Sequence, residues 1–335
     1  MKAVVMTQPG GTDVLQMQDV ADPKLENNRD ILVRLYAAGV NPIDTKLRKR
    51  GPLMNADKSP MILGCDGAGV VEAIASDVQN IRVGDEVYFC HGGVGGPHGN
   101  YAEYAVVDER FVAHKPKSLN FTEAAVAPLV LITAWESLYD RANLQAGQKA
   151  LIHAGAGGVG HVAIQLAKLQ GADVCTTVST QEKADFVRQL GADLPIFYKQ
   201  KDVVEAVMEW TNGEGVDVAF DTVGGETFFQ TCPAVKIYGD LVTILEPNPE
   251  YGTLKTARLR NLRIGLELML TPMLQNLIVE QQDQGKILQQ CARLIDENKL
   301  KVQLSKTFPL ADASAAHDLL ETGSMLGKIA LQIRE

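Results

Sequence analysis

The chain has 335 residues and a formal net charge of -9; 46% of its residues are hydrophobic and 22% are charged. This length suits two domains, and the composition is ordinary for a globular protein. The acidic balance, with no basic run beyond Lys46–Arg50, argues against nucleic acids and anionic membrane surfaces as partners. No apolar run approaches the ~20 residues of a membrane-spanning helix, and the first residues lack a signal-peptide pattern.

The cysteines carry information about the compartment. The chain has five of them, an odd number, and no two form a C-x-x-C pair. Scattered cysteines without framework spacing indicate reduced thiols, so we expect a cytoplasmic protein.

Residues 1–120 are expected to be rich in β-strands. Glycine and aspartate separate the apolar runs, and few helical periods occur, so a small barrel or sandwich fits better than a helical module. A loop at His91–Gly99 contains five glycines and a proline and is expected to be mobile. The strands are predicted at Lys2–Met6, Ile31–Ala38, Val70–Ala75 and Glu86–Phe89.

The pattern changes at Thr122. An apolar helical pattern covers Thr122–Asp140 and is broken by Pro128, and strands and helices alternate after it. Such alternation predicts a parallel, doubly wound sheet with helices on both faces. The alternating segments are Ala150–Ala154, Gly160–Gln170, Ala172–Val178, Gln181–Leu190, Ile196–Tyr198, Asp202–Trp210, Val216–Asp221, Glu226–Lys236, Gly239–Leu245 and Leu262–Leu270.

The alternation stops after Pro272. The remaining residues resemble the β-rich first part, so we expect the C-terminus to return and complete the first domain. The predicted segments are a helix through Gly285–Asn298, strands at Val302–Phe308 and Lys328–Ile333, and a helix at Ala311–Leu320.

The chain is organised around a glycine-rich stretch that follows the strand Ala150–Ala154. Its sequence matches G-x-G-x-x-G in the strand–turn–helix context that a dinucleotide-binding fingerprint requires. The three glycines allow a tight turn, a close approach of the backbone to a pyrophosphate and close helix packing, and the helix N-terminus supplies N–H groups. A merely structural glycine turn is the alternative. The predicted cofactor-binding residues here are Gly155, Ala156, Gly157, Gly158, Val159 and Gly160.

The end of the second strand predicts which cofactor binds. An NAD site usually carries an acidic residue there, ~20 residues past the glycines, for the ribose hydroxyl. Here no carboxylate occurs before Glu182, whereas Ser179 and Lys183 can bind a 2′-phosphate and Tyr198 ends the next strand. We therefore predict NADPH. Alternatively, Lys183 is a solvated helix lysine and Ser179 caps the helix.

Five segments of the chain carry a family resemblance: Ala38–Asp44, Gly64–Val71, Val83–Val87, Ala154–Gly160 and Phe220–Gly225. They resemble the medium-chain dehydrogenase/reductase superfamily, and within it the zinc-free quinone oxidoreductase (zeta-crystallin-like) branch. The resemblance implies a GroES-like β-rich catalytic domain from both chain ends, at 1–123 and 271–335, and a Rossmann NADPH-binding domain at 124–270. It also implies NADPH-dependent reduction of quinones, enones or related carbonyl compounds.

Zinc alcohol dehydrogenases share this fold, so a metal has to be considered. A catalytic zinc needs three protein ligands. The resemblance places the ligand positions at Asn41, Cys65 and Leu129, of which only Cys65 is a usable ligand, and the four-cysteine structural lobe is missing. A cluster of Cys90 with the histidines of the glycine loop is a weaker alternative. We expect no metal.

Without zinc, hydrogen-bond donors must polarise the substrate carbonyl. The first candidate is Asn41, whose alternative is a turn residue before Pro42. The second is Thr133, which matches the family threonine beside the nicotinamide and is otherwise an ordinary helix threonine.

Two lysines and two carboxylates complete the candidates. Lys46 replaces the family tyrosine and is a candidate proton donor, although an exposed lysine is more often simply solvated. Lys328 is expected to approach the cofactor. Asp44 and Asp66 are acid–base candidates, although capping of loops is the simpler interpretation.

Three functions remain open. The first is the zinc-independent reductase of quinones or enones; the second is an alkenal or enoyl-thioester reductase; the third is a nucleotide-binding structural or regulatory protein without turnover. We also expect a homodimer, because an apolar strand at Leu262–Leu270 would leave an open sheet edge that can pair with its own copy.

Overall fold

The computed structural model describes residues 1–53, 61–95, 98–323 and 325–335. Gly96 and Pro97 of the predicted glycine loop therefore lie outside the described residues. No helix of the described part is long and apolar enough to cross a membrane. The chain forms two compact units: Met1–Ile132 with Leu270–Asn298 and Val302–Glu335, and Thr133–Met269 with Lys299–Lys301. The domain boundaries predicted from the sequence, 1–123 with 271–335 and 124–270, remain predictions.

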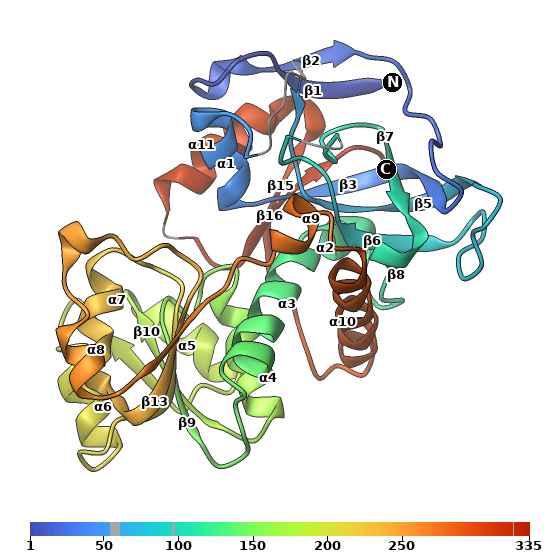
Figure 1. Ribbon diagram of the computed structural model, residues 1–335. Coiled ribbons are helices and arrows are strands. Elements are labelled where there is room, and N and C mark those ends of the chain that lie inside the picture. Colours follow the sequence, from blue (N-terminus) through green and yellow to red (C-terminus); the bar gives the residue numbers. More distant parts are fainter. Residues whose placement is uncertain (54–60, 96–97, 324) are drawn as a thin grey trace. The chain divides into compact units, whose positions relative to one another are not determined.

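The first unit is built on strands from both ends of the chain. They are β1 (Lys2–Met6), β2 (Leu15–Asp19), β3 (Asp30–Val40), β4 (Met61–Ile62), β5 (Asp66–Ile74), β6 (Glu86–Cys90), β7 (Tyr104–Asp108), β8 (Val112–His114), β15 (Leu304–Pro309) and β16 (Lys328–Gln332). The larger sheet has the order β15-β16-β3-β5-β6-β8, with β7 also on β3, and a smaller one has the order β2-β1-β4 (Figure 1). Because β16 pairs antiparallel with β3, the C-terminus completes this sheet, as the sequence predicted.

The core of this unit follows from the alternation of side chains along β3. Ile31, Val33 and Leu35 are fully buried and share one apolar cluster with Val87 and Phe89 of β6. Since successive side chains of a strand point to opposite faces, this period of two directs one face of β3 into the core.

Helices pack around the first unit. They are α1 (Pro42–Arg50), α2 (Phe121–Ala125), α3 (Pro128–Trp135, which continues into the second unit), α9 (Thr271–Leu274), α10 (Ile278–Asp296) and α11 (Ala313–Thr322). Single helical turns lie at Thr12–Val14, Glu109–Phe111 and Leu310–Asp312. Helix α10 lies against β8 and the Glu109–Phe111 turn: Tyr88 Oη donates to Leu288 O at 2.5 Å, and a Cβ at Gly285 would lie 2.6 Å from Arg110 O.

Helix α1 is absent from the sequence prediction, which expected few helices in this part. Asn41 precedes the helix in an extended conformation, Pro42 occupies its first position, and the Asn41 backbone N–H donates to Asp44 Oδ2 at 2.8 Å. A side chain at the third helical position that binds the N-cap backbone is half of a capping box, and proline suits the first position. The alternative in which Asn41 is a turn residue before Pro42 is therefore corrected: Asn41 is the N-cap of α1.

The second unit is an α/β unit with a six-stranded parallel sheet (Figure 1). Its strands are β9 (Lys149–Ile152), β10 (Asp173–Val178), β11 (Leu194–Phe197), β12 (Val216–Asp221), β13 (Val235–Thr243) and β14 (Arg263–Leu266), in the order β11-β10-β9-β12-β13-β14. Its helices are α4 (Gly160–Leu169), α5 (Gln181–Gln189), α6 (Val203–Trp210), α7 (Glu226–Thr231) and α8 (Lys255–Leu259), and a π-helical stretch covers Glu136–Arg141. This strand order is that of a Rossmann dinucleotide-binding sheet, and it confirms the predicted doubly wound architecture.

Two predicted elements of this unit are wrong in extent. The helix expected over Glu226–Lys236 ends at Thr231, because Pro233 follows and has no N–H for a further helical bond. The strand expected over Leu262–Leu270 covers only Arg263–Leu266, because its partner β13 ends at Thr243, whose backbone O accepts from Glu267 N at 2.9 Å.

Candidate functional site

The glycine turn lies where the order of the parallel sheet reverses. Strand β9 has β10 on one side and β12 on the other, and ligands of such sheets bind at the carboxyl ends of the strands at this switch point. A Cβ at Gly155 would lie 2.0 Å from Thr176 Oγ1, and one at Gly160 would lie 2.4 Å from Ala154 O. Only glycine fits both positions. Helix α4 begins at Gly160, and the N–H groups of His161 and Val162 donate back to Gly157 O and Val159 O, both at 3.2 Å.

The end of β10 carries the residues predicted to select the cofactor. The strand ends at Val178, Ser179 follows, and no carboxylate precedes α5. Thr180, not Ser179, is the N-cap of α5, since its Oγ1 accepts from Lys183 N at 3.3 Å. This corrects the alternative in which Ser179 caps the helix. Lys183 lies in the first turn of α5 and is half-buried, and Tyr198 follows β11 with 51% of its surface exposed.

A buried polar cluster in the first unit contains two of the predicted residues. Asn41 Nδ2 donates to Asp66 Oδ2 at 2.9 Å, and Asn41 Oδ1 accepts from the Lys328 ammonium, which also donates to Val40 O at 3.2 Å. Asp66 Oδ1 accepts from Leu129 N at 2.8 Å. The Asn41 amide thus joins a buried carboxylate to a buried ammonium.

The cluster extends through Asp44 to helix α11. Tyr101 Oη donates to Asp44 Oδ2 at 3.1 Å and lies 3.2 Å from His317 Nε2. All three side chains are fully buried. Among the described residues, Asp44 Oδ1 and His317 Nδ1 have no hydrogen-bond partner.

Burial shifts the acidity of this cluster. It raises the pKa of Asp44 to about 7, against the hydrogen bond from the Asn41 backbone, and it raises the pKa of Asp66 against the nearby Lys328 ammonium. Burial also lowers the pKa of Lys328, which the two carboxylates oppose. Two buried carboxyls therefore interact electrostatically with one buried ammonium, and a proton on Asp44 would leave one negative and one positive charge in the cluster.

The remaining predicted catalytic residues are Lys46 and Thr133. Lys46 lies on the exposed face of α1, where partial burial and the nearby Arg50 lower the pKa of its ammonium. Thr133 is buried and belongs to the second unit, as do the glycine turn and Lys183. Lys328 was predicted to approach the cofactor; the contacts that the structure shows for its ammonium are with Asn41 and Val40.

The three positions that correspond to zinc ligands do not form a metal centre. Cys65 is fully buried with a free thiol, Asn41 is bonded to Asp66, and Leu129 contributes its backbone N–H. In the described part of the chain, no group of three or more His, Cys, Asp or Glu side chains is arranged to hold a metal ion.

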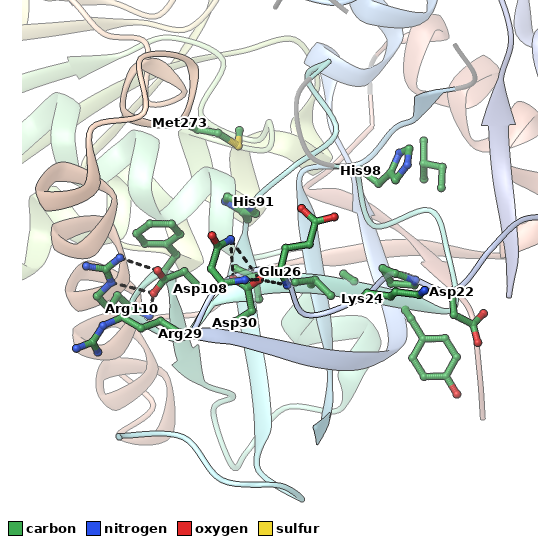
Figure 2. A pocket seen from close by; sticks show the side chains of 18 of the residues that line it. Asp22, Lys24, Glu26, Arg29, Asp30, His91, His98, Asp108, Arg110 and Met273 are labelled. Atoms are coloured by element: carbon green, nitrogen blue, oxygen red, sulfur yellow. Dashed lines mark hydrogen bonds and ion pairs between the residues drawn. The ribbon is translucent and has the colours of Figure 1, made fainter. Parts of the chain in front are cut away.

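A cavity of about 1470 Å³ lies elsewhere in the first unit, between the Val20–Asp30 segment, β7 and the start of α10 (Figure 2). Two of its carboxylates are hydrogen-bonded within the lining: Asp30 Oδ2 accepts from the backbone N–H groups of Glu26 and Asn27, and Asp108 forms an ion pair with Arg110 at 2.6 Å. None of the predicted site residues is among the described residues that line it.

Sequence reasoning missed several members of the polar network. The Asn-Pro-x-Asp spacing could have revealed the Asn41–Asp44 bond, because it is a helix-start signature. Tyr101 and His317 carry no local signal, since 216 residues separate them.

The chain matches the alcohol dehydrogenase GroES-like domain family over residues 27–117 and the zinc-binding dehydrogenase family over residues 190–331. It is 33% identical over 331 residues to a quinone oxidoreductase of Pseudomonas aeruginosa, covering 98% of this chain and 99% of that protein. It is 38% identical over 231 residues to the chloroplastic NADPH-dependent alkenal/one oxidoreductase of Arabidopsis thaliana, covering 67% of this chain and 58% of that protein. The crystal structure of Escherichia coli quinone oxidoreductase complexed with NADPH is similar with a TM-score of 0.85 and 28% identity, covering 99% of this chain and all of that one. The chain therefore belongs to the medium-chain dehydrogenase/reductase superfamily, in its quinone oxidoreductase-like branch.

Proposed function

We propose that this protein is an NADPH-dependent, zinc-independent reductase of quinones, enones or related carbonyl compounds. The observation that carries the proposal is the combination of a phosphate-binding glycine turn in one unit with a buried, hydrogen-bonded polar cluster at Asn41 in the other. The relatives named above include a quinone oxidoreductase and an alkenal/one oxidoreductase, which supports this substrate class.

The cofactor part of the proposal rests on the second unit. The residues fit a dinucleotide, because the Gly155 and Gly160 positions leave no room for a Cβ and α4 presents its N-terminus to the turn. The proposed contacts are the turn Gly155–Gly160 for the pyrophosphate, and Ser179, Lys183 and Tyr198 around the adenosine 2′-phosphate. Bound NADPH supplies the hydride; the chain orients the cofactor and stabilises charge.

The first unit supplies the charge stabilisation. The Asn41 amide has two N–H groups, of which one donates to Asp66, so the second can donate to a substrate oxygen. The adjacent Lys328 ammonium favours negative charge on that oxygen, and Thr133 is the proposed second donor. Lys46 is the proposed proton donor, because its lowered pKa brings the ammonium closer to neutral pH.

Lys183→Glu is expected to raise the KM for NADPH about 10- to 100-fold and to leave that for NADH nearly unchanged. A charge-assisted hydrogen bond to a phosphate is worth roughly 1.5–3 kcal/mol, and only NADPH carries that phosphate. Arg188→Glu, the same charge change at the other end of α5, is the control and should affect neither cofactor. Equal affinity of the unaltered protein for both cofactors would contradict the assignment.

One assay separates the candidate functions. NADPH oxidation is followed with a panel of quinones, enals and enoyl thioesters, with and without a chelator. Turnover that survives chelation supports the proposal, and the preferred acceptor decides between quinone and alkenal or thioester reduction. NADPH binding without oxidation by any acceptor would favour a regulatory role, and activity restored by zinc alone would overturn the metal-free mechanism.

We further propose a homodimer in the cytoplasm, without nucleic-acid or membrane partners. Strand β14 is the edge of its sheet and presents exposed Leu266 and, beyond the strand, Leu268. Solution scattering should give twice the chain mass, and Leu266→Lys should give the monomer mass, because a charge cannot be buried in the joined edge. Leu169→Lys, at an exposed apolar position on α4, should remain dimeric. A monomeric mass for the unaltered protein at micromolar concentration would contradict the dimer.

A further inference from the structure

His153 is buried at the end of β9, directly before the glycine turn, and its ring is bonded on both sides. Its Nε2 lies 2.8 Å from Thr231 Oγ1 of α7, and its Nδ1 lies 3.4 Å from Thr177 Oγ1 of β10. Its backbone O accepts from Thr222 Oγ1 at 2.8 Å. One side chain therefore connects two strands and a helix at the switch point.

The hydroxyl partners determine which ring nitrogen carries the proton. Thr231 Oγ1 donates its only proton to Thr227 O at 2.6 Å, so toward His153 it accepts, and Nε2 is the protonated nitrogen. Thr177 Oγ1 accepts from Ala154 N at 2.8 Å and can donate its own proton to Nδ1. Each group in this series therefore donates to the next, in the order Ala154, Thr177, His153, Thr231 and Thr227.

Ala154, the first donor of this series of hydrogen bonds, has a backbone conformation that must be held by its surroundings. Ala154 has a φ of +49°, a left-handed backbone conformation that residues other than glycine rarely adopt. Such a conformation persists only where the surroundings hold it, and here it leads the backbone into Gly155. Burial lowers the pKa of His153 to about 4, against the nearby Asp221, so Nδ1 remains an acceptor at physiological pH.

We propose that His153, as the Nε2–H tautomer, is the positioning residue of the nucleotide-binding turn. Its ring links the turn to α7: Nδ1 bonds Thr177, which binds Ala154 of the turn, and Nε2 bonds Thr231 of α7. The ring does this without touching the cofactor: it holds Ala154 in the conformation that aims the following backbone N–H groups at the pyrophosphate. This inference rests on the proposed NADPH-binding function.

The test removes the same bond from either side. In His153→Asn the Asn oxygen replaces Nδ1 but cannot reach Thr231, and in Thr231→Val the ring remains but its acceptor is lost. Each variant is expected to raise the Kd for NADPH about 3- to 10-fold, with kcat at saturating NADPH nearly unchanged. Because both substitutions delete the same His153–Thr231 bond, the double variant should bind NADPH no more weakly than either single variant. Thr211→Val is the control: it deletes a similar threonine bond, to Val207 O at 2.8 Å at the end of α6, and should leave the Kd unchanged.

A Kd that is unchanged in both variants, or effects that multiply in the double variant, would overturn the positioning role. Thermal unfolding checks that the variants are folded. If His153→Asn is not folded, the Kd of Thr231→Val alone decides whether His153 has the positioning role. Amide hydrogen exchange of Ala154 in the ligand-free protein gives an independent readout, and we expect it to be faster in His153→Asn and in Thr231→Val but not in Thr211→Val. If the unaltered protein fails to bind NADPH, the proposed function fails, and this exchange measurement still decides the role of His153: unchanged exchange would reject it.

Discussion

Asn41→Ala is expected to lower turnover by about 100- to 1000-fold, the typical effect of removing one preorganised donor from a water-poor site. The substitution also removes the amide that joins Asp66 to Lys328, so both buried charges lose a hydrogen-bond partner. The Kd for NADPH should stay nearly unchanged, because the glycine turn and Lys183 belong to the other unit. Steady-state kinetics and cofactor fluorescence measure the two quantities separately.

The matched control for this prediction is Asn120→Ala in the same unit. Asn120 is exposed, and its side chain caps α2 by accepting from Glu123 N at 2.9 Å. Loss of this cap should cost about 1 kcal/mol of stability and leave turnover unchanged. Turnover of Asn41→Ala within threefold of the unaltered protein would remove Asn41 from the mechanism.

Asp44→Asn is expected to make the protein more resistant to alkaline pH. Burial raises the pKa of Asp44 from 3.8 to about 7, so between these values the folded state binds a proton that the unfolded state has released. Stability is therefore fully present below pH 3.8 and falls as the pH rises toward 7, by about 4 kcal/mol in all. About 3 kcal/mol of this loss falls between pH 5 and pH 8.5, and the uncharged asparagine should not show it.

The measurement is the urea midpoint of both proteins at pH 5 and pH 8.5. Asp85→Asn is the control, since this half-buried carboxylate binds only the backbone N–H of Arg82 at 2.9 Å in its turn. If the unaltered protein and Asp44→Asn lose the same stability between the two pH values, Asp44 is ionised throughout and the cluster is not balanced by its proton.

The sequence by itself determined the nucleotide-binding part of this protein. An apolar strand, glycines at three fixed positions and a helix lie within the 21 residues from Ala150 to Gln170, so short-range sterics and periodicity are enough to predict the turn from Gly155 to Gly160. The alternation of strands and helices after Thr122 predicted the parallel sheet for the same reason. The extents of β14 and α7 were not predictable from periodicity, because the end of a neighbouring strand and a single proline set them.

Only the tertiary structure decided what surrounds Asn41 and His153. Lys328 reaches Val40 and Asn41 because β16 pairs with the end of β3, across 287 residues between Asn41 and Lys328. Likewise, His153 meets Thr231 only because α7 packs at the carboxyl ends of β9 and β12. Hydrogen bonds of this kind depend on the register of strands that are distant in sequence, and no local pattern encodes that register. The sequence could therefore name Asn41 as a donor, whereas the buried charges that it joins, and the proton that balances them, follow from the fold.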